Sequence, residues 1–133
     1  MSKVMAYSGM ISAIAVVLVK ATGQFFSLIS PLIGALGTFV TGSDTSANVL
    51  FGKLQVEVAS KTNIDPYWLA AANTAGATGG KMISPQSIAV ATAATGLVGS
   101  EGRPLNQTLK YCACYVAFLG VFVYLGSLFF MGR

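Results

Sequence analysis

The chain has 133 residues, of which 54% are hydrophobic and only 9% are charged, and its mean hydropathy is +0.71. Soluble domains carry about 25% charged residues, so this composition is typical of a membrane protein and argues against a soluble enzyme. The eight Lys and Arg residues give a net charge of +4 but are scattered. Because nucleic-acid binding needs a clustered basic face, we expect a lipid bilayer and no nucleic acid as partner.

The few residues suited to metal or acid–base chemistry are also poorly placed for it. Cys112 and Cys114 form a C-x-C pair inside an apolar run, and the chain has no histidine. Two such cysteines provide neither a disulfide framework nor a complete set of metal ligands. Histidine is the commonest general base and metal ligand. We therefore predict no enzymatic activity, no catalytic residue, no metal and no cofactor.

The first two elements are uncharged runs. Residues 4–19 lie between two lysines and predict a first helix that ends near Thr22. Residues 24–40 form the second run, with Pro31 inside it. Because proline disfavours the helical conformation of the residue before it, we expect a kink or an interrupted helix here. In lipid, such a break must pack against other protein.

A first cluster of small polar residues follows at residues 41–48, TGSDTSAN. Ser43 and Asp44 are both good N-caps for the helix that follows. An ordinary polar loop that caps an interfacial helix is the simpler alternative. The density of side-chain oxygens favours a binding role, and it singles out Ser43, Asp44, Thr45 and Asn48.

A second cluster covers residues 73–92, NTAGATGGKMISPQSIAVAT. Glycine costs roughly 1 kcal/mol relative to alanine inside a helix, so the glycines at 76, 79 and 80 disfavour a continuous one. We expect an inward limb that ends at Asn73 and Thr74, followed by a broken helix or a re-entrant hairpin.

Lys81 lies at the centre of this second cluster. A lysine at membrane depth is costly and faces protein, water or an opposite charge. Ser84 and Pro85 predict the N-cap and first residue of a new helix that runs to about Val98. Because the start of a helix attracts anions, Lys81 and this helix together predict an anion site.

The remainder of the chain is simpler. Residues 100–107, SEGRPLNQ, predict a polar connector. Residues 111–131 are uncharged and long enough, at about 1.5 Å per residue, to cross a bilayer. This run predicts a transmembrane helix.

The two polar clusters share one design, because each places flexible backbone and small polar side chains before a helix N-terminus. Secondary transporters bring paired broken helices together in this way to form a midplane site. One cluster carries an acid, Asp44, and the other a base, Lys81. We interpret them as the two sides of a solute pathway; two polar loops at the membrane surface are the alternative.

The same residues resemble a known family. The strings FVTGSDTSANVLFGKLQ, AANTAG and GKMISPQSIAVATAATGLVG are similar to the C-terminal region of the bacterial L-lactate permease family, from about Met5 to Lys110. More loosely, the two clusters look like hairpin-tip motifs of dicarboxylate and ion transporters. The resemblance implies an all-α, multi-pass protein of the bacterial inner membrane that carries L-lactate or glycolate together with protons.

Family members are several times longer than this chain. The resemblance therefore implies that residues 1–133 are the C-terminal transmembrane region of a larger inverted-repeat transporter. We expect three or four crossings and one re-entrant element in this chain, and its partner is the missing N-terminal portion or a second copy. The alternative is a non-transporting membrane remnant or partner subunit whose helices only pack.

Within the matched motifs, the charged residues have the clearest expected roles. Lys81 is expected to hold the substrate carboxylate, and Asp44 to take up the coupled proton. The other expected substrate contacts are short polar side chains in the same motifs, namely Ser84, Gln86, Asn73, Thr74, Ser43, Thr45 and Asn48.

Overall fold

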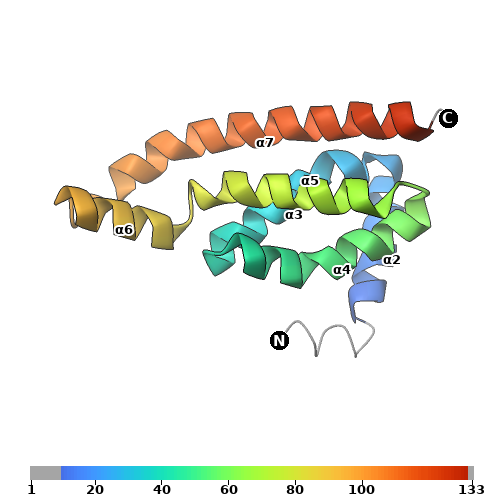
Figure 1. Ribbon diagram of the computed structural model, residues 1–133, viewed down its shortest axis with the longest axis horizontal. Coiled ribbons are helices and arrows are strands. Elements are labelled where there is room, and N and C mark those ends of the chain that lie inside the picture. Colours follow the sequence, from blue (N-terminus) through green and yellow to red (C-terminus); the bar gives the residue numbers. More distant parts are fainter. Residues whose placement is uncertain (1–9, 132–133) are drawn as a thin grey trace.

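The structure, a computed structural model, describes residues 10–131, and these form a bundle of helices (Figure 1). The described part of the chain contains no strand, so the expected all-α class is confirmed. The prediction for residues 4–9 lies outside the described residues. The helices, with the labels of Figure 1, are α2 (Met10–Thr22), α3 (Phe26–Thr41), α4 (Asp44–Thr62), α5 (Pro66–Lys81), α6 (Pro85–Thr95) and α7 (Gly102–Met131), with a 3₁₀ turn at Gly23–Phe25.

Helices α3, α4, α5 and α7 form the body of the molecule (Figure 1). α3 and α4 form an antiparallel hairpin, in which Ser30 of α3 bonds to Gln55 of α4. α5 runs parallel to α3 and packs closely against it. α7 runs antiparallel across both, since Trp68 near the start of α5 donates to the Val123 carbonyl near the end of α7.

Glycines bring the backbones of α3 and α5 into direct contact. A Cβ on Gly76 would meet the Pro31 backbone, and a Cβ on Gly80 would meet the Ala35 backbone. The same holds from the other side, where a Cβ on Gly34 would meet the Asn73 carbonyl. Gly76 and Gly80 have the four-residue spacing that permits close approach of membrane helices. Packing thus offsets the low helix propensity of glycine.

This packing corrects two sequence predictions. α5 does not end at Asn73 and Thr74 but continues through the glycines to Lys81. Likewise, α3 passes through Pro31 without interruption. Proline removes one hydrogen bond from a helix interior, but neighbouring helices can support the altered backbone. Pro31 is buried against Gly76, so such support is present.

An apolar core lies at the end of the bundle away from the α3–α4 loop. Its centre is the fully buried Phe26 of α3, Val58 of α4 and Leu69 of α5. Burying a side chain of this kind contributes about 1.5–3 kcal/mol. The core therefore fixes α3, α4 and α5 relative to one another at one end of the bundle, and the α3–α4 loop lies at the other end.

The chain after α5 differs in part from the expected course. α6 ends at Thr95 rather than near Val98, and it projects beyond the bundle at the left of Figure 1. The expected connector at residues 100–107 is largely helical, because α7 already begins at Gly102. Proline at 104 does not prevent this, since the first turn of a helix has no intrahelical N–H bonds to lose.

Two helical stretches of the described chain are long and apolar enough to cross a bilayer. They are Val19–Thr41, with a mean hydropathy of 1.5, and Gly102–Phe130, with a mean hydropathy of 2.1. The second contains most of the predicted span at 111–131. Three or four crossings were expected, but α5, with 16 residues, is short for a span, and α4 carries four charged residues.

Candidate functional site

The α3–α4 loop is a tight turn that consists of Gly42 and Ser43. Gly42 has a φ of +70° and donates its N–H to the Thr38 carbonyl at 2.7 Å, a common way to end a helix. Ser43 then begins α4, and its hydroxyl accepts the Ser46 N–H at 3.3 Å. Of the two expected caps, Ser43 is therefore the N-cap, and Asp44 is the first helical residue.

The break between α5 and α6 covers residues 82–84. Their backbone N–H groups bond three residues back, to carbonyls of α5, at 3.2–3.3 Å. Ser84 is completely buried, and its hydroxyl accepts the Ser87 N–H at 3.2 Å. Pro85 occupies the first helical position. The predicted N-cap and helix start are thus confirmed, and the interruption lies where Ser84 and Pro85 placed it.

The α3–α4 loop and the α5–α6 break meet in space. The Lys81 ammonium donates to the Gly42 carbonyl oxygen at 3.0 Å. The Gln86 side chain also covers Gly42, since a Cβ there would meet its amide oxygen. Because α3 and α5 are parallel, two helices end and two begin at this junction. The structure therefore brings together the two polar clusters that the sequence singled out.

Two buried oxygen atoms near this junction lack a partner. Within the described residues, the Thr38 hydroxyl and one carboxylate oxygen of Asp44 are the buried side-chain atoms without a hydrogen bond. Leaving a buried polar atom unpaired costs about 1–3 kcal/mol, so each such atom calls for an explanation. Lys81 does not supply it, because the described residues contain no ion pair between Lys81 and Asp44.

A second polar group lies deeper between α3, α4 and α5. The Asn73 amide donates to Asn48 at 2.8 Å, and the Thr74 hydroxyl donates to the same Asn48 oxygen at 3.1 Å. Gln55, completely buried, donates to the Asn73 oxygen at 3.1 Å and accepts from Ser30 at 2.9 Å. The bonds of Ser30, Gln55 and Asn73 satisfy groups that would be costly to bury alone.

The residues predicted from the sequence therefore fall into two groups and one exception. At about 1.5 Å per residue, Lys81 lies about 12 Å along α5 from Asn73, so one small anion does not touch both. Thr45 is exposed and forms no side-chain hydrogen bond with either group. The junction group consists of Ser43, Asp44, Lys81, Ser84 and Gln86. The deeper group consists of Asn48, Asn73 and Thr74, which bond to one another.

Sequence reasoning missed several members of both groups. Gln55 carries a signal, because it is a polar residue between Leu54 and Val58 on the buried side of α4. Thr38 and Gly42 carry little signal. A threonine in an apolar run and a glycine at a helix end are common, and only the tertiary contacts distinguish these two.

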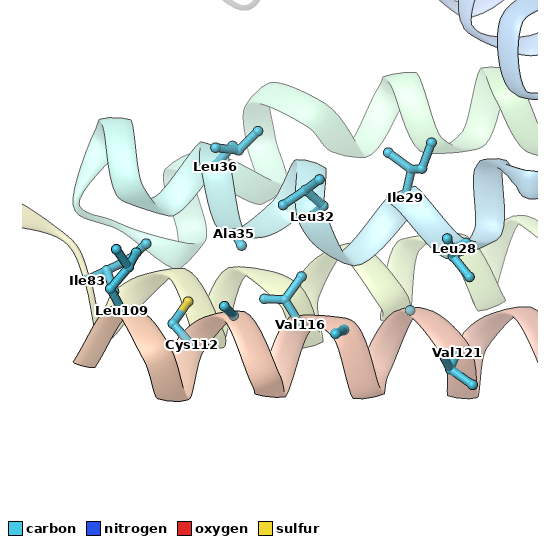
Figure 2. Close-up of a pocket in the computed structure, with 13 residues that line it drawn as sticks. Leu28, Ile29, Leu32, Ala35, Leu36, Ile83, Leu109, Cys112, Val116 and Val121 are labelled. Carbon is cyan, nitrogen blue, oxygen red and sulfur yellow. The ribbon is translucent and has the colours of Figure 1, made fainter. Parts of the chain in front are cut away.

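An apolar groove lies between α3 and α7 and reaches the α5–α6 break at Ile83 (Figure 2). Its volume is about 570 Å³, and no charged side chain lines it. Such a surface suits lipid tails or another helix, whereas a carboxylate needs charged or hydrogen-bonding groups. We therefore place the candidate anion site at the junction. The labelled lining residues are Leu28, Ile29, Leu32, Ala35, Leu36, Ile83, Leu109, Cys112, Val116 and Val121.

The junction offers hydrogen-bonding and charge chemistry. It contains one ammonium group, one carboxylate, several hydroxyls and an amide. Between residues 10 and 131, no group of three or more Cys, Asp or Glu side chains is arranged to hold a metal ion. These groups can bind an anion and exchange a proton.

The apolar helices, the hairpin and the interrupted helix are features of a helical membrane protein. The family model described as L-lactate permease matches residues 1–130. The chain belongs to the L-lactate permease family, which is a family of permeases, and the resemblance seen in the sequence is confirmed.

Curated relatives agree with this assignment. The chain is 48% identical to a glycolate permease of Escherichia coli K12 over 126 residues, which cover 95% of the chain and 22% of that protein. It is 48% identical to the L-lactate permease of the same organism over 115 residues, 86% of the chain and 21% of that protein. The chain thus spans about a fifth of these relatives. No solved structure matches it.

Proposed function

We propose that this chain is part of a carrier that moves L-lactate and similar small 2-hydroxy monocarboxylates, with protons, across the bacterial inner membrane. The names of the relatives, L-lactate permease and glycolate permease, support the substrate class. The observation that carries the proposal for this chain is the bond between Lys81 and the Gly42 carbonyl. This bond holds Lys81, the only cation in the two polar clusters, at the junction where α3 and α5 end and α4 and α6 begin.

In this proposal the chain is the C-terminal, multi-pass region of the carrier, one side of an inverted-repeat site. The remaining side comes from the N-terminal portion of the carrier or from a second copy. Discontinuous helices of such transporters turn their helix starts toward anionic substrate groups. α6 has this arrangement, because it begins beside Lys81.

The substrate carboxylate binds to Lys81 and to the start of α6. A carboxylate is a stronger acceptor for an ammonium than a neutral carbonyl is, so it displaces Gly42 from Lys81. Ser84 and Gln86 belong to this end of the site. Asn73 and Thr74 reach a substrate only if it moves about 12 Å along α5, as it does along a pathway through the protein.

Asp44 takes up the coupled proton. One of its carboxylate oxygens is buried without a hydrogen-bond donor, which leaves that oxygen free to receive a proton. Asp44 follows Gly42 by two residues, so displacement of the Gly42 carbonyl changes the surroundings of this carboxyl group. The two events are therefore coupled through the α3–α4 loop.

The test of Lys81 uses a chimeric carrier in which this chain replaces the matching segment of the E. coli L-lactate permease. Lys81→Met removes a charge-assisted hydrogen bond of about 1.5–3 kcal/mol, so lactate affinity should fall by roughly one to two decades. Concentration-dependent uptake of labelled lactate measures this. Lys53→Met, an exposed lysine of α4, is the control. Unchanged affinity in a correctly inserted Lys81→Met carrier would make Lys81 structural only.

The test of Asp44 separates a proton carrier from a helix-stabilising charge. Asp44→Asn keeps a polar side chain but cannot ionise. We expect the chimeric carrier with this change to exchange lactate for lactate while it no longer concentrates lactate when a pH difference is imposed. If concentration driven by the pH difference persists, the proton travels elsewhere, and Asp44 only stabilises the start of α4.

A further inference from the structure

Thr38 departs from the pattern of most helical threonines in the described chain. Six threonines donate their hydroxyl to the carbonyl four residues earlier, at 2.8–3.2 Å, and these are Thr41, Thr62, Thr78, Thr92, Thr95 and Thr108. This local bond is readily available to a threonine in a helix. Thr38 lies in the last turn of α3 and is completely buried, yet its hydroxyl has no partner among the described residues.

The position of Thr38 connects it to the junction. It follows Gly34 by four residues, and Gly34 packs against the backbone of α5, so Thr38 lies on the same face of α3 one turn later. Its carbonyl accepts the Gly42 N–H at 2.7 Å, and the Gly42 carbonyl in turn accepts from Lys81. Thr38 is therefore about one helical turn from the point where the ammonium binds.

An unpaired buried hydroxyl weakens the folded state, and valine would fill the same space without that penalty. Packing therefore gives no reason for threonine at this position. A hydroxyl here has a use only when something else brings it a partner, because it can both donate and accept.

We propose that Thr38 is a specificity-determining residue whose hydroxyl binds the 2-hydroxyl group of the substrate. This inference rests on the proposed function, in which the carboxylate binds Lys81. When the carboxylate displaces the Gly42 carbonyl from Lys81, the α3–α4 loop is released, and the substrate hydroxyl reaches the Thr38 hydroxyl about one helical turn away. Thr38 thereby distinguishes 2-hydroxy acids from acids that lack this group.

The experiment measures how well unlabelled propionate, compared with unlabelled lactate, inhibits labelled lactate uptake by the chimeric carrier. Propionate has the carbon skeleton of lactate without the hydroxyl. Loss of one hydrogen bond should reduce the preference for lactate over propionate by roughly three- to tenfold in Thr38→Val. The matched control is Thr92→Val, because Thr92 is equally buried but bonds within its own helix.

Thermal stability tests directly whether the Thr38 hydroxyl lacks a hydrogen-bond partner. The melting temperature of the 133-residue chain in detergent should not fall in Thr38→Val, because no bond is lost. Thr38→Ser keeps the hydroxyl and should keep the preference for lactate. This variant serves as a control in case the Thr38→Val carrier is inactive for another reason.

The outcomes separate the two proposals. Lactate uptake with an unchanged preference in Thr38→Val overturns the role of Thr38 and leaves the proposed function intact. A lower melting temperature in Thr38→Val, or a preference lost equally in Thr38→Ser, also overturns it. An inserted chimeric carrier that takes up no lactate overturns the proposed function, and the role of Thr38 with it.

Discussion

At the scale of single residues, the α3–α5 contact depends on glycines, which have no side chain. Gly76 and Gly80 place hydrogen atoms against the backbone of Pro31 and Ala35, where any other residue would place a carbon. A clash with backbone is harder to relieve than a clash with a flexible side chain, because the whole helix must move. The contact therefore tolerates no larger residue at these positions.

Alanine substitutions of two helical glycines should have opposite effects. Gly76→Ala forces α3 and α5 apart, and overpacking of this kind typically costs 1–3 kcal/mol, so about that loss of unfolding free energy is expected. Gly52 in α4 has open space around it, and Gly52→Ala should stabilise the chain by up to about 1 kcal/mol. Thermal unfolding of the purified chain in detergent measures both. Equal effects would contradict the backbone contact.

Individual residues differed in how far the sequence could predict them. Ser84 and Pro85 act locally, so their pattern alone predicted a helix start that the structure confirms. The buried network around Gln55 depends on side chains 18 and 25 residues away, which no local pattern specifies. The unpaired hydroxyl of Thr38 is likewise visible only once its surroundings are known.

At the scale of elements, the sequence located the polar clusters but predicted two interruptions, at Pro31 of α3 and after Thr74 of α5, where the helices continue. From intrinsic helix propensity, the glycines of α5 and Pro31 of α3 were expected to interrupt their helices. In the structure, α3 and α5 pack against each other, and this packing supports both helices. The interruptions that persist are those with capping chemistry, at Gly42–Ser43 and at residues 82–84. A break in these helices thus follows from caps rather than from weak helix formers.

The contact between the α3–α4 loop and α6 can be tested with two glycines of matched conformation. Gly42 and Gly96 both end helices, with φ of +70° and +71°, but only Gly42 has a neighbour, the Gln86 side chain. A left-handed alanine costs roughly 1–2 kcal/mol, so Gly96→Ala should lose about that much stability. Gly42→Ala should lose more.

A double mutant identifies the source of the difference. Gln86→Ala removes the side chain that covers Gly42, so the extra loss in Gly42→Ala should largely disappear when both changes are combined. The coupling energy from thermal unfolding of the four proteins gives this directly. Additive losses would mean that the loop and α6 do not touch in solution.

At the scale of the whole molecule, the chain is small relative to its family and leaves much apolar surface open. It spans about a fifth of the curated relatives, and α7 exposes large side chains such as Phe118, Phe129 and Phe130. The groove between α3 and α7 adds to this surface (Figure 2). In a bilayer such a surface meets lipid or further helices.

The chain alone should insert into membranes without accumulating lactate, because the proposed site lacks its opposite side. Uptake by proteoliposomes that contain the 133-residue chain measures this. Coexpression with the rest of the E. coli L-lactate permease should restore uptake, which a remnant whose helices only pack would not do. Proton-coupled uptake by the chain alone would refute the fragment interpretation and point to a homodimer.

The meshing of α3 and α5 also limits how this protein can change shape. The backbones of α3 and α5 are in contact at glycines. The two helices cannot slide past one another in small steps, because sliding would bring the larger neighbouring side chains against the opposite backbone. We therefore expect α3 and α5 to move together as one rigid body in any conformational change. Any alternation between two states must then be absorbed at the helix interruptions, and Gly42 and residues 82–84 provide two of these at the level of Lys81.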